Sequence, residues 1–356
     1  MYGAAMLRLG ELGYIHRLAR GRQHAKDVVR QWIEMAALLA LTGNGPRYYQ
    51  LAGFWRKDVR WRQMRRHMSY REYQAELDRL NPMPYRKLSQ SKVAEKAILT
   101  MMGIPTPRCV GFLDVECGRD TRGAPLRNAD DLVRLLAREP ADRLCFKLIE
   151  GHGGEGFVAA EVRRGANSAR FRPLNKDGEM SAEEFVAFLG LRPGHPRLIE
   201  TYLIQHPAYA AFNPTSVNTL RLWVLRRGAR ATTRLGYLRI GRGGSLVDNQ
   251  SAGGIVAPID LKTGRLSEAT DGRPPRNVYR QHPDHGAPIE GVVLPLLREA
   301  TALAEQCMTV FPDLNFAGVD VAMTPDGPMI IETNLQPDRE GAAYVGMPTR
   351  DVFAYD

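Results

Sequence analysis

The pattern of apolar and polar residues is helical near the start of the chain. Apolar side chains recur every three or four positions through 28–40, which is the spacing of one helix face. Glycine and proline at 43–46 end that pattern, and the Asn-Pro-Met-Pro run at 81–84 ends a second one. We therefore expect residues 1–85 to form a helical region, with a domain boundary near residue 85.

Beyond residue 85 the pattern alternates between helix and strand. Ser89 is expected to begin a helix that ends at Gly103. A capping box at 181–184 predicts a short helix, and apolar residues spaced through 292–307 predict a long amphipathic one. Runs rich in apolar and β-branched residues predict strands at 144–149, 157–162, 197–205, 219–226 and 234–240. The chain is thus expected to be α+β, divided into 1–85, 86–200 and 201–356.

A predicted hairpin over 316–334 brings acidic residues together. Its loop is expected at Pro325-Asp326-Gly327, with glycine in the position that takes positive φ. Centring the hairpin on Asp326 places Asp320 opposite Glu332, and the two-residue period of a strand puts Asn334 on the same face. Facing carboxylates repel each other. A divalent cation between them removes that repulsion, and two carboxylates with an amide oxygen suit Mg²⁺.

A solvent-facing hairpin with incidental acids is the alternative interpretation. The other face of the hairpin carries Val321, Met323, Met329 and Ile331. This predicts one packed face and one polar face with a separate use, and therefore favours the metal site.

A glycine-rich loop follows a strand that ends in Lys147. The glycines are Gly151, Gly153, Gly154 and Gly156, and another strand is expected directly after them. Exposed backbone N–H groups in such a loop can hold phosphate, and a nearby lysine adds positive charge. The segment is not a P-loop, because the Gly-Lys-Ser/Thr element is missing and no helix follows. An ordinary hairpin turn remains the alternative.

Two further segments suggest binding. Arg221 lies in a strand that otherwise looks buried, so it is expected to face an anion or a carboxylate, with a structural ion pair as the alternative. The run from Asn249 to Gly253-Gly254 indicates either a close backbone approach to a bound molecule or a β-bulge.

Composition limits the class of protein. The 356 residues are 44% hydrophobic and 25% charged, as in a folded globular chain. No apolar run approaches the roughly 20 residues of a membrane-spanning helix, and no secretory signal is expected. The four cysteines form no CxxC pair and no zinc spacing, so a reduced, cytoplasmic protein is expected.

The positive charge is concentrated near the N-terminus. Residues 1–75 hold 14 Lys and Arg against 5 Asp and Glu, whereas the rest of the chain holds 35 against 34. Such a block suits a phosphate-rich or acidic partner. The alternative is a solvated helical face with Trp55, Trp61 and Met64 packed inward.

Taken in order, these segments resemble the ATP-grasp superfamily, and within it the sugar-transfer associated proteins related to α-L-glutamate ligases. The resemblance runs from about residue 88 to residue 348. It is carried by Ser91-Lys92 with 103–107, Lys147 with the glycine loop, 200–206, 216–221, 249–254, and 318–320 with 332–334.

The resemblance implies two α+β subdomains that hold ATP between them, preceded here by the basic helical segment. Lys92 and Lys147 would contact the phosphates, and the loop of Gly151, Gly153, Gly154 and Gly156 would close over them. Glu200 to Leu203 looks like the hinge that recognises adenine through main-chain groups.

The resemblance also implies the reacting groups. Asp320, Glu332 and Asn334 look like ligands for one or two Mg²⁺ ions, and Arg221, with Lys147, would stabilise charge on the transferred phosphoryl group. The substrate pocket would be bordered by Asn249, Gly253, Gly254 and Arg239. The arginines near it, Arg221, Arg239 and Arg242, suggest an anionic substrate. The usual α/β domain in front of the core looks replaced by the helical segment, which leaves the substrate open.

The implied activity is that of an ATP- and Mg²⁺-dependent ligase. Such an enzyme joins a small carboxylate to an amine through an acyl phosphate and releases ADP and phosphate. Three alternatives remain: a ligase that uses a macromolecular carrier such as aminoacyl-tRNA or a peptide at the basic N-terminus, a phosphotransferase, and a non-catalytic module that binds nucleotide or an anionic polymer.

Overall fold

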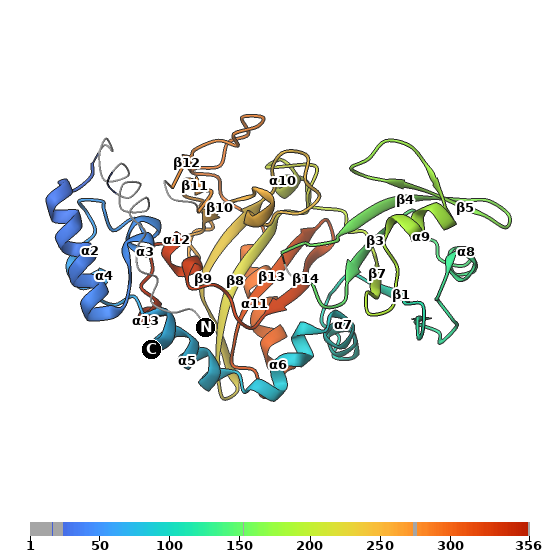
Figure 1. The fold of residues 1–356 in the computed structure, drawn as a ribbon, viewed down its shortest axis with the longest axis horizontal. Coiled ribbons are helices and arrows are strands. Elements are labelled where there is room, and N and C mark those ends of the chain that lie inside the picture. The colour runs from blue at the N-terminus through green and yellow to red at the C-terminus, as the bar shows by residue number, and fades with distance from the viewer. Residues whose placement is uncertain (1–15, 17–23, 152, 273–275, 355–356) are drawn as a thin grey trace.

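Two seven-stranded antiparallel sheets form the body of the molecule, and a group of helices packs at the end opposite the first sheet (Figure 1). The structure, a computed structural model, describes residues 16, 24–151, 153–272 and 276–354. The mixed α+β architecture expected from the sequence is confirmed. In the described part of the chain, no helix is long and apolar enough to cross a membrane.

Two of the N-terminal helices, α2 (Val28–Thr42) and α5 (Tyr70–Leu80), end where the sequence predicts, at 43–46 and at 81. Asp27 caps the first of them by accepting a hydrogen bond from the amide of Arg30, and Gly43 ends it in a left-handed conformation with φ of 70°. Met64 is buried and Trp55 and Trp61 pack in the same cluster, as the alternative interpretation of the basic segment predicts. The helices are α2 (Val28–Thr42), α3 (Pro46–Leu51), α4 (Trp61–Met64), α5 (Tyr70–Leu80), α6 (Met83–Gln90) and α7 (Lys92–Met101).

The predicted start of the helix before Gly103 was wrong by two residues. Ser89 belongs to α6, and it is Ser91 that caps α7 by accepting from the amide of Ala94. Pro82 and Pro84 do not break the chain into a loop, because proline is tolerated in the first turn and α6 begins there.

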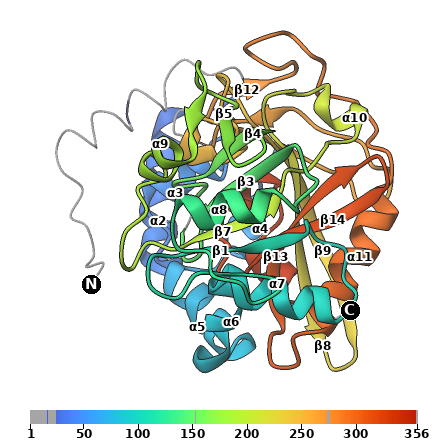
Figure 2. The same ribbon diagram turned by 90° about the vertical axis from the view of Figure 1, so that its right-hand side faces the viewer.

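The first sheet has the strand order β2-β1-β7-β3-β4-β5-β6 and faces the viewer in Figure 2. Helices α8 and α9 cover one face, where Phe171 and Phe185 stack with centroids 4.2 Å apart. Ser181 forms the predicted capping box with Glu184. The elements are β1 (Cys109–Leu113), β2 (Arg119–Asp120), α8 (Ala129–Leu136), β3 (Arg143–Leu148), β4 (Val158–Arg164), β5 (Ala169–Pro173), β6 (Met180–Ser181), α9 (Ala182–Phe188) and β7 (Arg197–Thr201).

The second sheet has the order β12-β11-β10-β9-β8-β13-β14 and is covered on both faces. On β8, Leu222 and Val224 pack in the cluster around α11, whereas Trp223 and Leu225 pack against α5. The elements are α10 (Pro207–Ala210), β8 (Thr219–Arg227), β9 (Arg230–Ile240), the 3₁₀ turn η1 (Gln250–Ala252), β10 (Ile255–Pro258), β11 (Ala269–Thr270), β12 (Val278–Tyr279), α11 (Leu297–Thr309), β13 (Phe316–Thr324), β14 (Gly327–Asn334), α12 (Glu340–Tyr344) and α13 (Thr349–Val352).

The hairpin of β13 and β14 has the predicted pairing but a different turn. Thr324 pairs with Gly327, so the loop has two residues instead of three. A bulge between Asp320 and Val321 then shifts the register by one residue, and Asp320 pairs with Glu332 as predicted. The bulge also places Ile331 beside a cavity, so its predicted position on the packed face was wrong.

Candidate active site

Two adjoining cavities lie where the two sheets meet. The inner cavity, of about 130 Å³, is bordered by the first sheet, α7 and the second sheet. The outer cavity, of about 510 Å³, continues from it toward α12. Predicted site residues line the inner cavity as follows: Lys92, Lys147, Gly151, Gly153, Gly154, Leu203, Arg239, Asn249, Asp320 and Glu332. The outer cavity adds Arg221 and Asn334.

A buried carboxylate holds two lysines under the inner cavity. Glu200, with no exposed surface, accepts from Lys147 Nζ at 2.5 Å and lies 3.3 Å from Lys96 Nζ. Burial disfavours both charged forms, but the attraction outweighs it: the pKa of Glu200 is lowered and that of Lys147 is raised. Both groups are therefore ionised at neutral pH. The Glu200 side chain does not line the cavity, and Thr201, Tyr202 and Leu203 do.

The glycine loop lies against the chain that follows β9. Gly153 and Gly154 have φ of 63° and 78°, which favours glycine. A Cβ on Gly154 would stand 2.9 Å from Asn249 Oδ1, so the backbone can approach this closely only without a side chain. Lys92, the first residue of α7, donates from Nζ to the carbonyl oxygen of Gly151 at 2.9 Å. These contacts hold the loop over the inner cavity.

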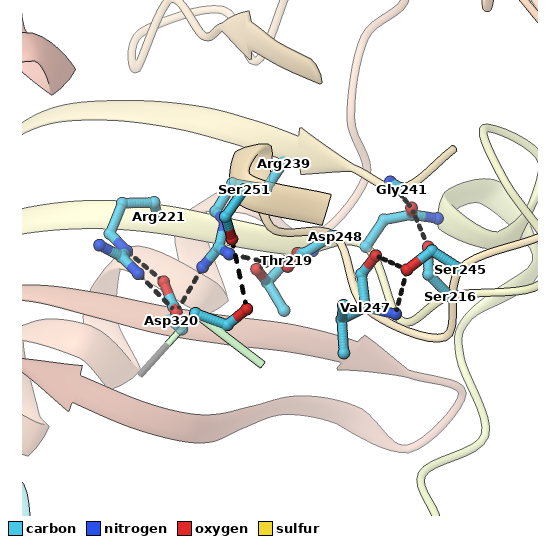
Figure 3. A network of polar contacts seen from close by, with 12 residues as sticks. Ser216, Thr219, Arg221, Arg239, Gly241, Ser245, Val247, Asp248, Ser251 and Asp320 are labelled. Atoms are coloured by element: carbon cyan, nitrogen blue, oxygen red, sulfur yellow. Dashed lines mark hydrogen bonds and ion pairs between the residues drawn. The ribbon is translucent and has the colours of Figure 1, made fainter. Parts of the chain in front are cut away.

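A chain of alternating charges crosses the second sheet (Figure 3). Arg221 on β8 donates through Nε and Nη2 to both oxygens of Asp320, and Arg239 on β9 donates from Nη1 to Asp320 Oδ2 at 2.8 Å. Arg239 Nη2 also lies 3.0 Å from Asp248, which accepts from the amide and hydroxyl of Thr219. Two arginines and two aspartates balance in charge, so each buried ion has a partner.

The facing acids of the hairpin are a candidate metal-ligand set in which both oxygens of Asp320 already accept hydrogen bonds from arginines. Burial alone would raise the pKa of Asp320, but the two arginines lower it, so the carboxylate is ionised at neutral pH. Glu332 borders both cavities and Asn334 borders the outer one. Asp320 borders only the inner cavity, so the two carboxylates and the amide oxygen are spread over the junction of the two cavities. Such oxygen ligands suit Mg²⁺, which also takes phosphate oxygens.

Some predicted residues lie outside the cavities. Gly253 and Gly254 line neither one; a Cβ on Gly254 would stand 2.3 Å from the carbonyl oxygen of Asp248, so its close approach is to its own chain. Gly156 has φ of 62° and approaches Arg197. The predicted roles of these residues stay predictions.

The sequence analysis missed three buried residues of this region. Lys96 follows Lys92 by one helical turn and contacts Glu200, a spacing that was visible in the sequence. Asp248 directly precedes Asn249, but nothing local indicated that it pairs with Arg239. Thr219 pairs with Asp248 across 29 residues and had no sequence signal.

Two antiparallel sheets thus enclose a cavity whose lining includes lysines and acids. The model of the family described as sugar-transfer associated ATP-grasp matches residues 72–347. The chain belongs to this family, and the resemblance noted in the sequence is confirmed.

The comparison with curated proteins gave no match. Among solved structures, the D-alanine-D-alanine ligase from Coxiella burnetii has a TM-score of 0.44 at 13% identity and covers 77% of this chain and 57% of its own. N5-carboxyaminoimidazole synthetase from Staphylococcus aureus, complexed with ADP, has a TM-score of 0.41 at 10% identity, with 79% and 59% covered. D-cycloserine synthetase DcsG has a TM-score of 0.39 at 13% identity, with 81% of each chain covered. This chain thus spans little more than half the length of the first two proteins.

Proposed function

We propose that this protein is an ATP- and Mg²⁺-dependent ligase that joins a carboxylate to an amine through an acyl phosphate. The observation that carries the proposal is the Asp320–Glu332 pair at the boundary of the two cavities, with Asn334 beside it and buried cations around it. Acids that face each other at a cavity lined by lysine and arginine suit a site for metal-bound phosphates.

Different side chains of the site would bind different parts of the metal–nucleotide complex. Lys92 and Lys147 would hold phosphate oxygens beside the glycine loop, which lines the inner cavity. Arg221 and Arg239 add positive charge beside the acids. When bound by Asp320, Glu332 and Asn334, Mg²⁺ supplies further charge neutralisation for the transferred phosphoryl group.

The reaction needs positioning and charge rather than a nucleophilic side chain. The substrate carboxylate attacks the γ-phosphorus of ATP, which forms an acyl phosphate and releases ADP. The amine then attacks the carbonyl carbon, the C–O bond to phosphate breaks, and the amine loses a proton as the amide forms. The two connected cavities give the nucleotide and the second substrate separate spaces.

The reaction class is tested by phosphorus NMR of the protein with Mg-ATP and pooled carboxylates, with and without hydroxylamine. We expect ADP and phosphate that increase with hydroxylamine, together with a hydroxamate that identifies the carboxylate by mass. A phosphorylated product without an amide would indicate a phosphotransferase. AMP with pyrophosphate would overturn the proposed mechanism, and turnover that requires tRNA or a peptide would indicate a carrier.

Glu332→Gln tests the metal site. The substitution keeps the shape but removes one ligand charge, and we expect Mg²⁺-dependent ADP formation to fall roughly 100-fold or more. Glu116→Gln, at an exposed position, is the matched control and should retain activity. Near-wild-type turnover of Glu332→Gln, at an unchanged melting temperature, would contradict the assignment.

A further inference from the structure

The loop of residues 335–339, which directly follows Asn334, lies between the outer cavity and the N-terminal helices. On its inner side, Leu335, Gln336 and Asp338 line the outer cavity. On its outer side, the loop is bound to α5 and to the segment between α2 and α5. The loop also contacts the predicted metal ligand directly, because the amide of Gln336 donates to Asn334 Oδ1 at 3.0 Å.

A cation from the loop enters a cage formed by the N-terminal region. The guanidinium of Arg339 lies 4.1 Å from the centroid of the Tyr48 ring. Its Nη1 donates to Asn44 Oδ1 at 2.6 Å and to the carbonyl oxygen of Met68 at 2.9 Å. The cage is itself fixed, because the Asn44 amide donates to the carbonyl oxygen of His67 at 3.0 Å. The left-handed turn at Gly43 that ends α2 is what brings Asn44 to this place.

One side chain from α5, and one from the residue that caps its C-terminus, bind the loop backbone. Tyr73 donates from its hydroxyl to the carbonyl oxygen of Pro337 at 2.8 Å. Asn81, with no exposed surface, donates from Nδ2 to the carbonyl oxygens of Phe316 and Leu335 at 2.8 and 3.1 Å. Its Oδ1 accepts from the amide of Phe316 at 3.1 Å. Asn81 thus connects the start of β13 to the end of β14, the two strands that carry Asp320 and Glu332.

We propose that the N-terminal helices are a positioning element for the metal-ligand set, with Arg339, Tyr73 and Asn81 as the positioning residues. This inference rests on the proposed function, in which Asn334 is a ligand of Mg²⁺. The cage residues Asn44, Tyr48 and Met68 lie outside the family-matched range of 72–347, whereas Tyr73, Asn81 and Arg339 lie inside it. Residues that hold a metal ligand in place set metal affinity although they do not touch the metal.

The contact between Arg339 and the N-terminal region also gives this basic region a structural role that does not need an anionic partner. The region contributes oxygen acceptors and an aromatic face, and these bind a cation of the core. A buried guanidinium is costly unless oxygen acceptors and an aromatic face surround it. The Arg339 side chain is therefore accommodated in this one place, which fixes the position of the 335–339 loop.

The test measures Mn²⁺ binding, used as a spectroscopic probe in place of Mg²⁺, to the full chain with saturating ADP by electron paramagnetic resonance. In Arg339→Gln we expect Mn²⁺ affinity to fall roughly 10- to 100-fold. Arg339→Lys should recover part of the loss, because it keeps the cation over Tyr48. Tyr73→Phe, which removes one hydroxyl, should weaken binding less than Arg339→Gln. ADP affinity without metal should change little in all three variants.

Arg66→Gln is the matched control. Arg66 pairs with Asp351 at 2.7 Å and so also connects the N-terminal region to the core, but it does not touch the 335–339 loop. We expect Mn²⁺ affinity in Arg66→Gln to equal that of the wild type. Equal affinities in Arg339→Gln and Arg66→Gln would overturn the inference. If the wild-type protein with ADP binds no Mn²⁺, or Glu332→Gln binds it as well as the wild type does, the proposed metal site itself fails.

Discussion

Replacing Glu200 by glutamine removes the only carboxylate within ion-pair distance of Lys147 and Lys96 among the described residues. The glutamine keeps the size of the side chain but leaves two ammonium groups without a counter-charge. Lys96 retains the Thr106 hydroxyl and the carbonyl oxygen of Ile330, so most of the loss falls on Lys147. Breaking a buried pair in this way costs about 3–5 kcal/mol of unfolding free energy. Because 15% of the Lys147 side chain is exposed, we expect the lower end, about 3 kcal/mol.

The pH dependence of this loss has a definite sign. In the wild type the pKa of Lys147 is raised. Its contribution to the unfolding free energy is therefore fully present at pH 7 and is lost only at pH values above the usual pKa range of lysine. In Glu200→Gln the burial of Lys147 remains without the attraction of Glu200, so the pKa of Lys147 falls and its ammonium loses the proton at lower pH than in the wild type. The difference in stability from the wild type should therefore be smaller at pH 9 than at pH 7.

Urea unfolding followed by tryptophan fluorescence at both pH values measures the effect. Combining Glu200→Gln with Lys147→Met removes the uncompensated charge and should be more stable than Glu200→Gln alone. Glu161→Gln is the control, because Glu161 also accepts from two cations, Arg143 and Arg172, but at the surface of the same sheet; we expect a much smaller change there. Two results would refute this account of the buried ion pair. One is an unfolding free energy of Glu200→Gln within about 1 kcal/mol of the wild type at pH 7, and the other is a double variant no more stable than Glu200→Gln.

Two other positions give distinct outcomes. Burial raises the pKa of Glu95 to about 7, so its contribution to stability is greatest below about pH 4.5 and is lost as the pH rises from there through 7. Relative to the wild type, Glu95→Gln should therefore gain about 2.5 kcal/mol of unfolding free energy between pH 5 and pH 8 in chemical unfolding, and a constant difference would contradict this. Gly154→Ala brings a Cβ within 3.0 Å of Val247 at positive φ and should raise the KM for ATP several-fold, whereas Gly243→Ala, also at positive φ but with nothing within 4 Å, should leave it unchanged. Equal KM values in the two alanine variants would show that crowding in the glycine loop has no effect.

Local signals in the sequence were sufficient for several elements that matter to the site. The end of α2 at Gly43, the capping box at Ser181 and the pairing of Asp320 with Glu332 were predicted, because each depends on residues that are near in sequence. The pairing was right although the turn was not. The structure reaches it with a two-residue loop and a bulge, which shift the register in a way that spacing alone does not reveal.

The strand order could not be predicted in the same way. Strand β7 lies between β1 and β3, so the strand that carries Glu200 pairs with two strands that precede it by many residues. Only this pairing puts Glu200 beside Lys147, and the sequence analysis had placed Glu200 at the adenine hinge without its lysine partners.

The sequence by itself determined which chemistry the chain carries: a glycine loop after Lys147, an acidic hairpin, and the family to which these belong. The tertiary structure alone decided which charges neutralise one another. Arg239 pairs with Asp320, 81 residues away in sequence, and Arg339 donates a hydrogen bond to Asn44, 295 residues away. Helix caps are fixed by hydrogen bonds between near neighbours, so local residues specify them. A buried charge, by contrast, needs whichever opposite charge or acceptor the packed chain brings to it, and no spacing in the sequence records that choice.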